Sequence, residues 1–286
     1  VVSSVIKLLG NFKGLRSAEA GEFTRCALEN GKIDLAQVEG LADLIDAETD
    51  AQHKQAARIF NGALGEKTKE WRAKLVKAGA LLVATLDFAD EEVPEEVTPE
   101  VEKLINMVLS DLDKEIIGVQ TAERIRSGFE VAIVGAPNLG KSTLLNYLVG
   151  RDAAITSNVS GTTRDVIEVK LDLRGLPVTI LDTAGIRKSD DKVEEIGIRR
   201  ALERSSLSDL RIVLTEEGES PSGLKRRDTD RICIAKDDQG NRGGVSGKTG
   251  AGIDRLKNNI WNILNDKAQY VGCLLYTSPS PRDNLP

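Results

Sequence analysis

Residues 135–142 read Gly-Ala-Pro-Asn-Leu-Gly-Lys-Ser, and this motif constrains the fold more than any other feature of the chain. It follows the apolar run 131–134 and precedes the segment 143–148, so strand, loop and helix stand in the order that a phosphate-binding loop (P-loop) requires. Backbone N–H groups of such a loop converge on phosphates at the positive end of a helix. Lys141 can reach the β- and γ-phosphates, and Ser142 can ligate Mg²⁺. The motif predicts an α/β P-loop domain that binds a nucleotide.

Two polar segments follow the P-loop in the order expected for a Mg²⁺-nucleotide site. A short apolar strand ends in Asp182-Thr183-Ala184-Gly185, and the loop 161–165 carries hydroxyl side chains before it. An Asp that closes a buried strand can hold Mg²⁺ through water, and the N–H of Gly185 can approach a γ-phosphate. Thr163 is the candidate hydroxyl ligand that completes the Mg²⁺ shell. All three motifs in this order favour a nucleotide site over a Gly-rich helix N-terminus without a ligand.

The identity of the base depends on two later loops. GTPases usually read guanine with an Asn-Lys-x-Asp loop after a strand, and here the strand 231–234 is followed by Ala235-Lys236-Asp237-Asp238. Lys236 can cover the ring and Asp238 can accept from two base hydrogens, but the usual Asn is missing. Ser246-Gly247-Lys248 matches the type of loop whose backbone contacts the guanine O6. The alternatives are a solvated turn for the first loop and a Gly-rich turn before a helix for the second.

These motifs, together with the segment before them, resemble one family. The P-loop is spelled Gly-x-Pro-Asn-x-Gly-Lys-Ser and is followed by Gly-Thr-Thr-Arg-Asp, by Asp-Thr-Ala-Gly-Ile-Arg and by Val-Glu-Glu-Ile-Gly-Ile at 193–198. Upstream, residues 20–25, 30–37 and 41–47 are similar to that family's junction between a folate-binding and a helical domain. The chain thus resembles the MnmE (TrmE) family of tRNA modification GTPases over residues 3 to 270. Era-like GTPases share the nucleotide motifs but lack the upstream segment.

The catalytic machinery differs from that of many small GTPases. Ile186 stands where these proteins carry a water-orienting Gln, and its side chain cannot form hydrogen bonds. The resemblance implies that Glu194 orients the water beside a catalytic Lys141, and that a bound K⁺ takes the part of an arginine finger. The implied K⁺ ligands are Asn138, Ser157, Val159 and Thr162. The alternatives are that Glu194 belongs to a solvated acidic face and that Asn138 is a simple turn residue.

The resemblance also implies a function and partners. It implies a GTPase whose cycle drives a conformational change in a cytoplasmic complex that modifies the wobble uridine (U34) of tRNA. The flavoprotein MnmG (GidA) would be its partner, and a 5,10-methylene- or formyl-tetrahydrofolate would serve the full-length protein, with Lys32 as a tentative folate contact. The homodimer would form through the nucleotide-binding (G) domains and the folate domain. The candidate GTP contacts are Asn138, Leu139, Gly140, Lys141, Ser142, Thr143, Asp182, Thr183, Ala184, Gly185, Lys236, Asp238, Ser246, Gly247 and Lys248.

Three other functions stay open at this point. One is an Era-like GTPase of ribosome or RNA assembly that performs no modification, although residues 20–47 argue against it. Another is a P-loop ATPase, which residues 182–185 and 246–250 disfavour. The third is an inactive fragment that retains nucleotide binding only.

Four segments are expected along the chain. Residues 1–33 form the end of a folate-binding domain, 34–125 the first half of a helical domain, 126–270 the G domain, and 271–286 a tail that looks non-native. Apolar residues at helical spacing predict three long helices with a bundle core between 34 and about 117, in the list Leu35, Val38, Leu41, Ile45, Leu75, Val76, Leu82, Val83, Leu86, Val101, Leu104, Ile105, Val108 and Leu112. Residues 216–230 are short for a segment that usually contains a crossover helix.

The composition excludes several classes of protein. With 286 residues, 40% of them apolar, the chain can bury a core, yet no run approaches the roughly 18 apolar residues of a membrane span. The three cysteines lack Cys-x-x-Cys spacing, so neither a zinc site nor a disulfide framework is indicated. The net charge of −6 means that tRNA binding requires a local basic patch or a partner's surface.

Overall fold

A five-stranded sheet forms the centre of the α/β part of the molecule. The computed structural model describes residues 2–87, 97–136, 138–151, 167–182, 204–218 and 226–269. The strands are β1 (Phe129–Gly135), β2 (Ile167–Leu173), β3 (Leu176–Asp182), β4 (Leu210–Thr215) and β5 (Arg231–Ile234), in the order β2-β3-β1-β4-β5. The antiparallel pairing of β2 with β3 closes one edge, whereas β3, β1, β4 and β5 run parallel. The predicted α/β class is confirmed, and β2 is a strand that the sequence motifs did not indicate.

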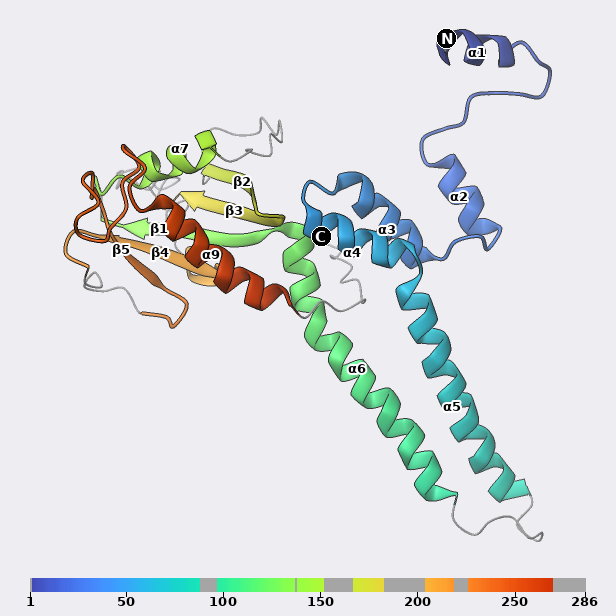
Figure 1. Cartoon of the computed structure of the whole chain (residues 1–286). Coiled ribbons are helices and arrows are strands. Elements are labelled where there is room, and N and C mark those ends of the chain that lie inside the picture. The colour runs from blue at the N-terminus through green and yellow to red at the C-terminus, as the bar shows by residue number, and fades with distance from the viewer. Residues whose placement is uncertain are drawn as a thin grey trace, which may run out of the picture.

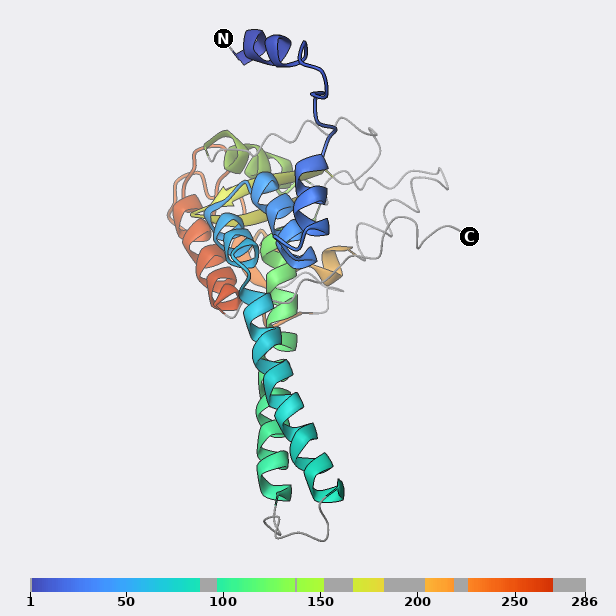
Figure 2. The same cartoon turned by 90° about the vertical axis from the view of Figure 1, so that its right-hand side faces the viewer.

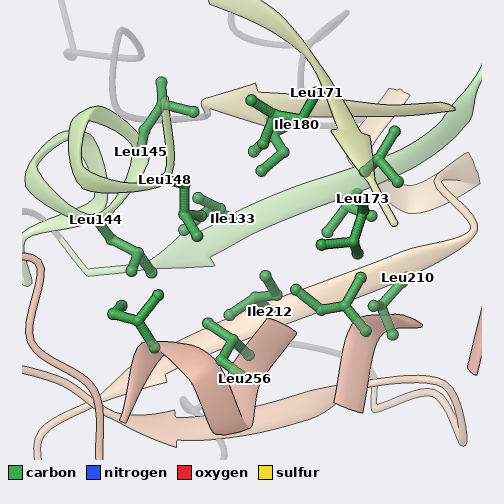
Figure 3. Close-up of a cluster of buried hydrophobic side chains, with 14 of the residues drawn as sticks. Ile133, Leu144, Leu145, Leu148, Leu171, Leu173, Ile180, Leu210, Ile212 and Leu256 are labelled. Atoms are coloured by element: carbon green, nitrogen blue, oxygen red, sulfur yellow. The ribbon is translucent and has the colours of Figure 1, made fainter. Parts of the chain in front are cut away.

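The core lies mainly on one face of this sheet. Alternate residues of β1 point to this face, where helices α7 (Lys141–Arg151) and α9 (Ile253–Ala268) cover them. Figure 3 shows leucines of α7 and Leu256 of α9 packed around Ile133 and Ile212. The opposite face carries a smaller buried cluster of Ala132, Val134, Leu181 and Val213. Two buried faces explain the apolar runs 131–134 of β1 and 212–214 of β4.

Two short, separately capped helices precede the long helices of the helical part. These are α3 (Leu35–Asp46) and α4 (Asp50–Phe60), and each starts with a capping box, Asp34 with Gln37 and Thr49 with Gln52. The long helices α5 (Ala63–Asp87) and α6 (Thr98–Ser127) then form a hairpin that projects from the sheet domain (Figures 1 and 2). The three predicted helices correspond to α3, α5 and α6, and α4, which follows the cap at Thr49, is an additional helix that was not among them. The first two helices, α1 (Val2–Leu9) and α2 (Glu22–Glu29), precede α3, and α1 lies away from the sheet, beyond α2 (Figure 1).

The hairpin buries one stripe of each helix and exposes the others. Trp71 and Ala78 of α5 and Val101 and Val108 of α6 are buried, and the spacing of seven residues in each pair is that of a coiled-coil seam. The expected bundle core is wrong for a set of residues that are exposed in this structure: Leu35, Ile45, Leu75, Val76, Leu82, Val83 and Ile105. The physical reason is that two helices in contact cover only one side of each other.

Hydrogen bonds and an ion pair connect the helical part to the sheet domain. The N–H of Ala51, in the first turn of α4, donates to the carbonyl of Gly175 in the β2–β3 turn at 2.9 Å. Arg124 Nε, near the end of α6, pairs with Asp209 Oδ1, just before β4, at 3.2 Å. The expected boundary at 125/126 falls in the last turn of α6, which ends where Gly128 adopts a φ of 96° before β1. The β2–β3 hairpin is thus held against the helices.

The connection from β4 to β5 contains no helix among its described residues, 216–218 and 226–230. β5 nevertheless pairs in parallel with β4, from Ile212 opposite Arg231 to Thr215 opposite Ile234. Arg211 of β4 donates from Nε and Nη2 to the two carboxylate oxygens of Asp230, at 2.8 and 2.7 Å. This buried pair fixes the start of β5 beside β4. No helix in the described part of the chain is long and apolar enough to cross a membrane.

Candidate nucleotide-binding site

The P-loop connects the end of β1 to the start of α7. Asn138 and Gly140 adopt left-handed φ angles of 66° and 81°, which let the chain turn sharply before the helix. The side chain of Lys141 is folded back, with Nζ donating to the carbonyls of Gly135 at 2.8 Å and Ala136 at 2.9 Å. The ammonium group thus lies over the loop, where an anionic oxygen can take the place of a carbonyl acceptor.

The first turn of α7 faces the same loop. Ser142 and Thr143 are exposed there, while Leu144, Leu145 and Leu148 anchor the helix in the core. Leu144 donates its N–H to the carbonyl of Gly140 at 2.8 Å, which starts the helix inside the motif. The N-terminal end of α7 therefore presents its positive dipole end and a hydroxyl at the loop, as phosphate and Mg²⁺ binding require.

Of the predicted site residues between α7 and the two base loops, only Asp182 belongs to the described part of the chain. The backbone of Asp182 pairs with Ile133 of β1, so Asp182 ends its strand at the same edge of the sheet as the P-loop. The other predicted residues of this kind lie outside the described residues: Ser157, Val159, Thr162, Thr163, Thr183, Ala184, Gly185 and Glu194. Their Mg²⁺, K⁺ and catalytic roles stay predictions, as does the non-native character of the tail 271–286, which also lies outside the described part.

A pocket of about 260 Å³ joins the P-loop to both candidate base loops. Its lining comprises Leu139, Gly140, Thr143, Leu144, Leu214, Ala235, Lys236, Asp238, Val245, Ser246, Gly247 and Lys248. Eight of these residues are predicted contacts from three separate motifs, and the fold brings them together. Leu144, Leu214 and Val245 were not indicated by the motifs, because an apolar wall leaves no sequence signature. A pocket with apolar walls and a few polar groups suits a planar base.

The two base loops are hydrogen-bonded to each other. Ser246 Oγ donates to Asp238 Oδ1 at 2.6 Å and accepts from the N–H groups of Lys248 and Thr249 at 3.2 and 3.1 Å. Thr249 Oγ1 donates to the carbonyl of Asp238 at 3.2 Å. Ser246 is 1% exposed, so these bonds are shielded from water. The Asp238 carboxylate is therefore oriented at the pocket wall, and neither loop is a plain solvated turn.

Close backbone packing joins the second base loop to the P-loop helix. A Cβ on Gly247 would lie 2.6 Å from the backbone of Thr143 and Leu144, so a larger residue cannot occupy that position without a shift. A Cβ on Gly250, which has a φ of 84°, would lie 2.4 Å from Cζ of the Tyr147 ring and closer still to its hydroxyl oxygen. The sequence predicted a glycine-rich loop here, and the structure shows which contact requires the glycine.

The first base loop departs from the usual pattern in two ways. Ala235 is buried and has no polar side chain where other GTPases carry Asn. The motif treats Asp237 as a variable position, yet its buried carboxylate accepts from the N–H groups of Gly244 at 2.8 Å and Arg242 at 3.0 Å. These backbone bonds, the Gly244 bond above all, hold the pKa of Asp237 below its usual value despite burial. The only sequence signal for this contact was the Gly243-Gly244 pair downstream.

The remaining candidates lie away from this pocket. Lys32 is exposed between α2 and α3, and its backbone N–H donates to the carbonyl of Ala27 at 2.8 Å. Within the described residues no cluster of His, Cys, Asp and Glu could hold a metal ion, and Cys26 and Cys233 are free thiols. The Lys32 role in folate binding stays a prediction.

Comparison with known proteins identifies the family. A family model described as the MnmE helical domain matches residues 35–277. The tRNA modification GTPase MnmE of Roseobacter denitrificans is 56% identical over 95% of this chain and 64% of its own length. The protein of the same name from Cereibacter sphaeroides strain ATH 2.4.9 is 59% identical over 96% of this chain and 64% of its own length. Among solved structures, Era of Aquifex aeolicus is 25% identical over 55% of this chain and 62% of that chain, with a TM-score of 0.36.

The chain thus spans less than two thirds of the length of these curated relatives. The family model covers the helices α3 to α6, the P-loop, the pocket and α9 in one continuous match. This match includes residues 35–47 of the upstream segment that carries the resemblance. The chain belongs to the MnmE family.

Proposed function

We propose that this chain binds and hydrolyses GTP as the nucleotide-dependent part of a tRNA-modifying GTPase. The observation that carries the proposal is the single pocket in which the P-loop residues Gly140 and Thr143 meet Asp238 and Ser246. The name of the relatives, tRNA modification GTPase MnmE, supports the same function.

Guanine fits this pocket better than adenine. The Asp238 carboxylate, held by Ser246, can accept from the two donors on the guanine edge, whereas adenine would present an acceptor to it. The apolar residues Leu139, Leu214 and Val245 supply walls for the ring. Losing the usual Asn at position 235 weakens this preference modestly.

Hydrolysis would use the positive end of α7. In this proposal Lys141 exchanges its two carbonyl acceptors for phosphate oxygens, which places its charge on the β- and γ-phosphates. Ser142, with Asp182 and Thr163, would hold Mg²⁺, which neutralises phosphate charge when bound. Glu194 would orient the attacking water, and Asn138 with residues 157–162 would hold K⁺.

The wider assignment follows from the family. We propose that GTP turnover drives a conformational change in a cytoplasmic complex with the flavoprotein MnmG and tRNA, and that the active form is a homodimer. A tetrahydrofolate would serve the full-length protein. The family match disfavours an Era-like assembly GTPase, and the base loops disfavour an ATPase.

The test is GTP turnover by the full chain with Mg²⁺ in K⁺ or in Na⁺. We expect hydrolysis to rise steeply in K⁺ and with protein concentration, because the cation and the second G domain stabilise the transition state. Glu194→Ala should lower kcat with little change in GTP affinity. Asp228→Ala, at an exposed site outside the pocket, is the control. Equal rates in Na⁺ and K⁺ would remove the cation from the proposal, and hydrolysis of ATP in preference to GTP would overturn it.

A further inference from the structure

The two base loops are positioned by Asp237, which occupies the variable position of the first guanine motif. The Asp237 carboxylate is 3% exposed and bonds to the N–H groups of Arg242 and Gly244, just before the second loop. Its own N–H donates to Val245 at 3.3 Å, and the N–H of Val245 donates to Ile234 at 2.7 Å. These bonds draw the segment 242–245 back against the end of β5. The spacing between the loops is therefore set at Asp237.

We propose that Asp237 is a positioning residue for guanine binding, which holds the loop 236–238 and the loop 246–248 at the separation that the base requires. This inference rests on the proposed nucleotide function. Asp237 itself does not line the pocket, so it acts through Asp238 and Ser246 and not by touching the ligand.

The absence of a polar side chain at position 235 makes this arrangement necessary. Ala235 offers only backbone groups, and its carbonyl accepts from Arg242 Nη2 at 3.1 Å. Arg242 therefore contacts the first loop twice. Its backbone N–H donates to the Asp237 carboxylate, and its guanidinium donates to the carbonyl of Ala235. Asp237 and Arg242 thus anchor the start of this loop, in addition to the bonds that Ser246 and Thr249 make to Asp238.

Steric contact shows how closely Gly244 packs against the end of β5 and against Asp237. A Cβ on Gly244 would lie 2.4 Å from the carbonyl oxygen of Ile234 and 2.9 Å from Asp237 Cβ. Since one of these atoms belongs to the backbone of β5, an alanine at position 244 must push the second loop away. Gly244→Ala therefore disturbs the same spacing without removing the carboxylate.

The experiment measures GDP and tripolyphosphate affinity of the full chain by calorimetry, for the wild type, Asp237→Ala and Asp237→Asn. Tripolyphosphate contacts the P-loop but not the base loops, so it reports the rest of the site. Asp237→Ala should weaken GDP binding roughly 10- to 100-fold, as for loss of hydrogen bonds to a charged group, and leave tripolyphosphate binding unchanged. Asp237→Asn keeps an acceptor, so its GDP affinity should lie between those of the wild type and Asp237→Ala. Gly244→Ala should weaken GDP binding as Asp237→Ala does. Asp228→Ala should bind GDP as the wild type does.

Two results would overturn the role of Asp237. One is unchanged GDP affinity in Asp237→Ala. The other is an equal loss of GDP and tripolyphosphate binding in Asp237→Asn, which retains the shape of the side chain and would then show general damage to the domain. If Asp237→Ala does not fold, the GDP and tripolyphosphate affinities of Asp237→Asn and Gly244→Ala test the role of Asp237 instead. A wild type that binds ADP as tightly as GDP would instead overturn the proposed guanine preference.

Discussion

At the scale of single residues, the motifs predicted the residues that line the pocket but not the residues that hold the base loops in position. Lys236, Asp238 and Ser246 line one pocket as expected, because residue types suited to contact a ligand recur in recognisable patterns. Asp237 was not predicted, since a buried carboxylate bonded to backbone N–H groups can arise at any position that the local turn brings near them. The requirement for glycine at position 247 likewise depends on α7, which lies far away in the sequence.

Substituting Gly247 tests the contact between the second base loop and α7. We expect Gly247→Ala to weaken GDP binding at least about tenfold, because the new Cβ meets backbone atoms of Thr143 and Leu144 that cannot move without shifting the P-loop helix. Gly79→Ala in α5 is the matched control, because a Cβ there meets no atom within 4 Å. That control should be neutral or stabilise the helix by up to about 1 kcal/mol. Equal GDP affinity in both variants would contradict the close contact.

At the scale of elements, alternation of strands and helices was predictable but some boundaries were not. β1, α7 and β5 appear where apolar runs indicated them, whereas α4, which follows the cap at Thr49, was not among the predicted helices. The joining of β4 to β5 depends on the buried pair of Arg211 and Asp230, which lie 19 residues apart in sequence. No local pattern predicts such a pair, because its partners meet only when the sheet has formed.

Breaking that pair should destabilise the sheet domain. Arg211 and Asp230 are 6% and 1% exposed in their side chains, so Arg211→Ala should lower the free energy of unfolding by about 3–5 kcal/mol, because it leaves a buried carboxylate without its cation. Lys69→Ala, which removes the exposed pair with Glu66, should change it by about 0.5 kcal/mol or less. Urea titrations of both variants measure this. Similar midpoints for the two variants would contradict a structural role for the buried pair.

The same pair predicts a pH dependence. Burial alone would raise the pKa of Asp230, but the bonds from Arg211 and the Arg227 N–H outweigh it and hold the pKa below the usual value. A lowered pKa in the folded state contributes stability above the pKa of the unfolded chain and loses it as the pH falls through the folded value. The wild type should therefore lose free energy of unfolding as the pH falls below about 4, the usual Asp pKa, and Asp230→Asn should make this loss smaller. An equal loss in Asp230→Asn would contradict this assignment.

At the scale of the whole molecule, the sequence indicated the helical and sheet parts but not which apolar faces are covered. The seam at Val101 and Val108 is buried, whereas Ile116 and Ile117 on the same helix are 60% and 68% exposed. Helical periodicity shows only that a residue lies on an apolar stripe. Whether another element covers the stripe depends on tertiary packing.

Exposed apolar stripes of this kind should promote self-association. We expect the chain to bind an apolar fluorescent dye and to sediment faster as its concentration rises. Ile117→Lys should reduce both effects, and Asp113→Lys, which adds a lysine to the same exposed helix without removing an apolar side chain, should reduce them less. Dye binding that is identical in the two variants would show that the α6 stripe is not the associating surface.

The central claim is that the P-loop and the two base loops form one guanine-nucleotide pocket. Calorimetric titration of the full chain with GDP and with ADP, in the presence of Mg²⁺, tests this claim most directly. We expect GDP to bind at least about tenfold more tightly, because each well-placed hydrogen bond to the charged Asp238 contributes about 1.5–3 kcal/mol. Asp238→Asn should remove most of that difference. ADP binding that equals or exceeds GDP binding in the wild type would contradict the account.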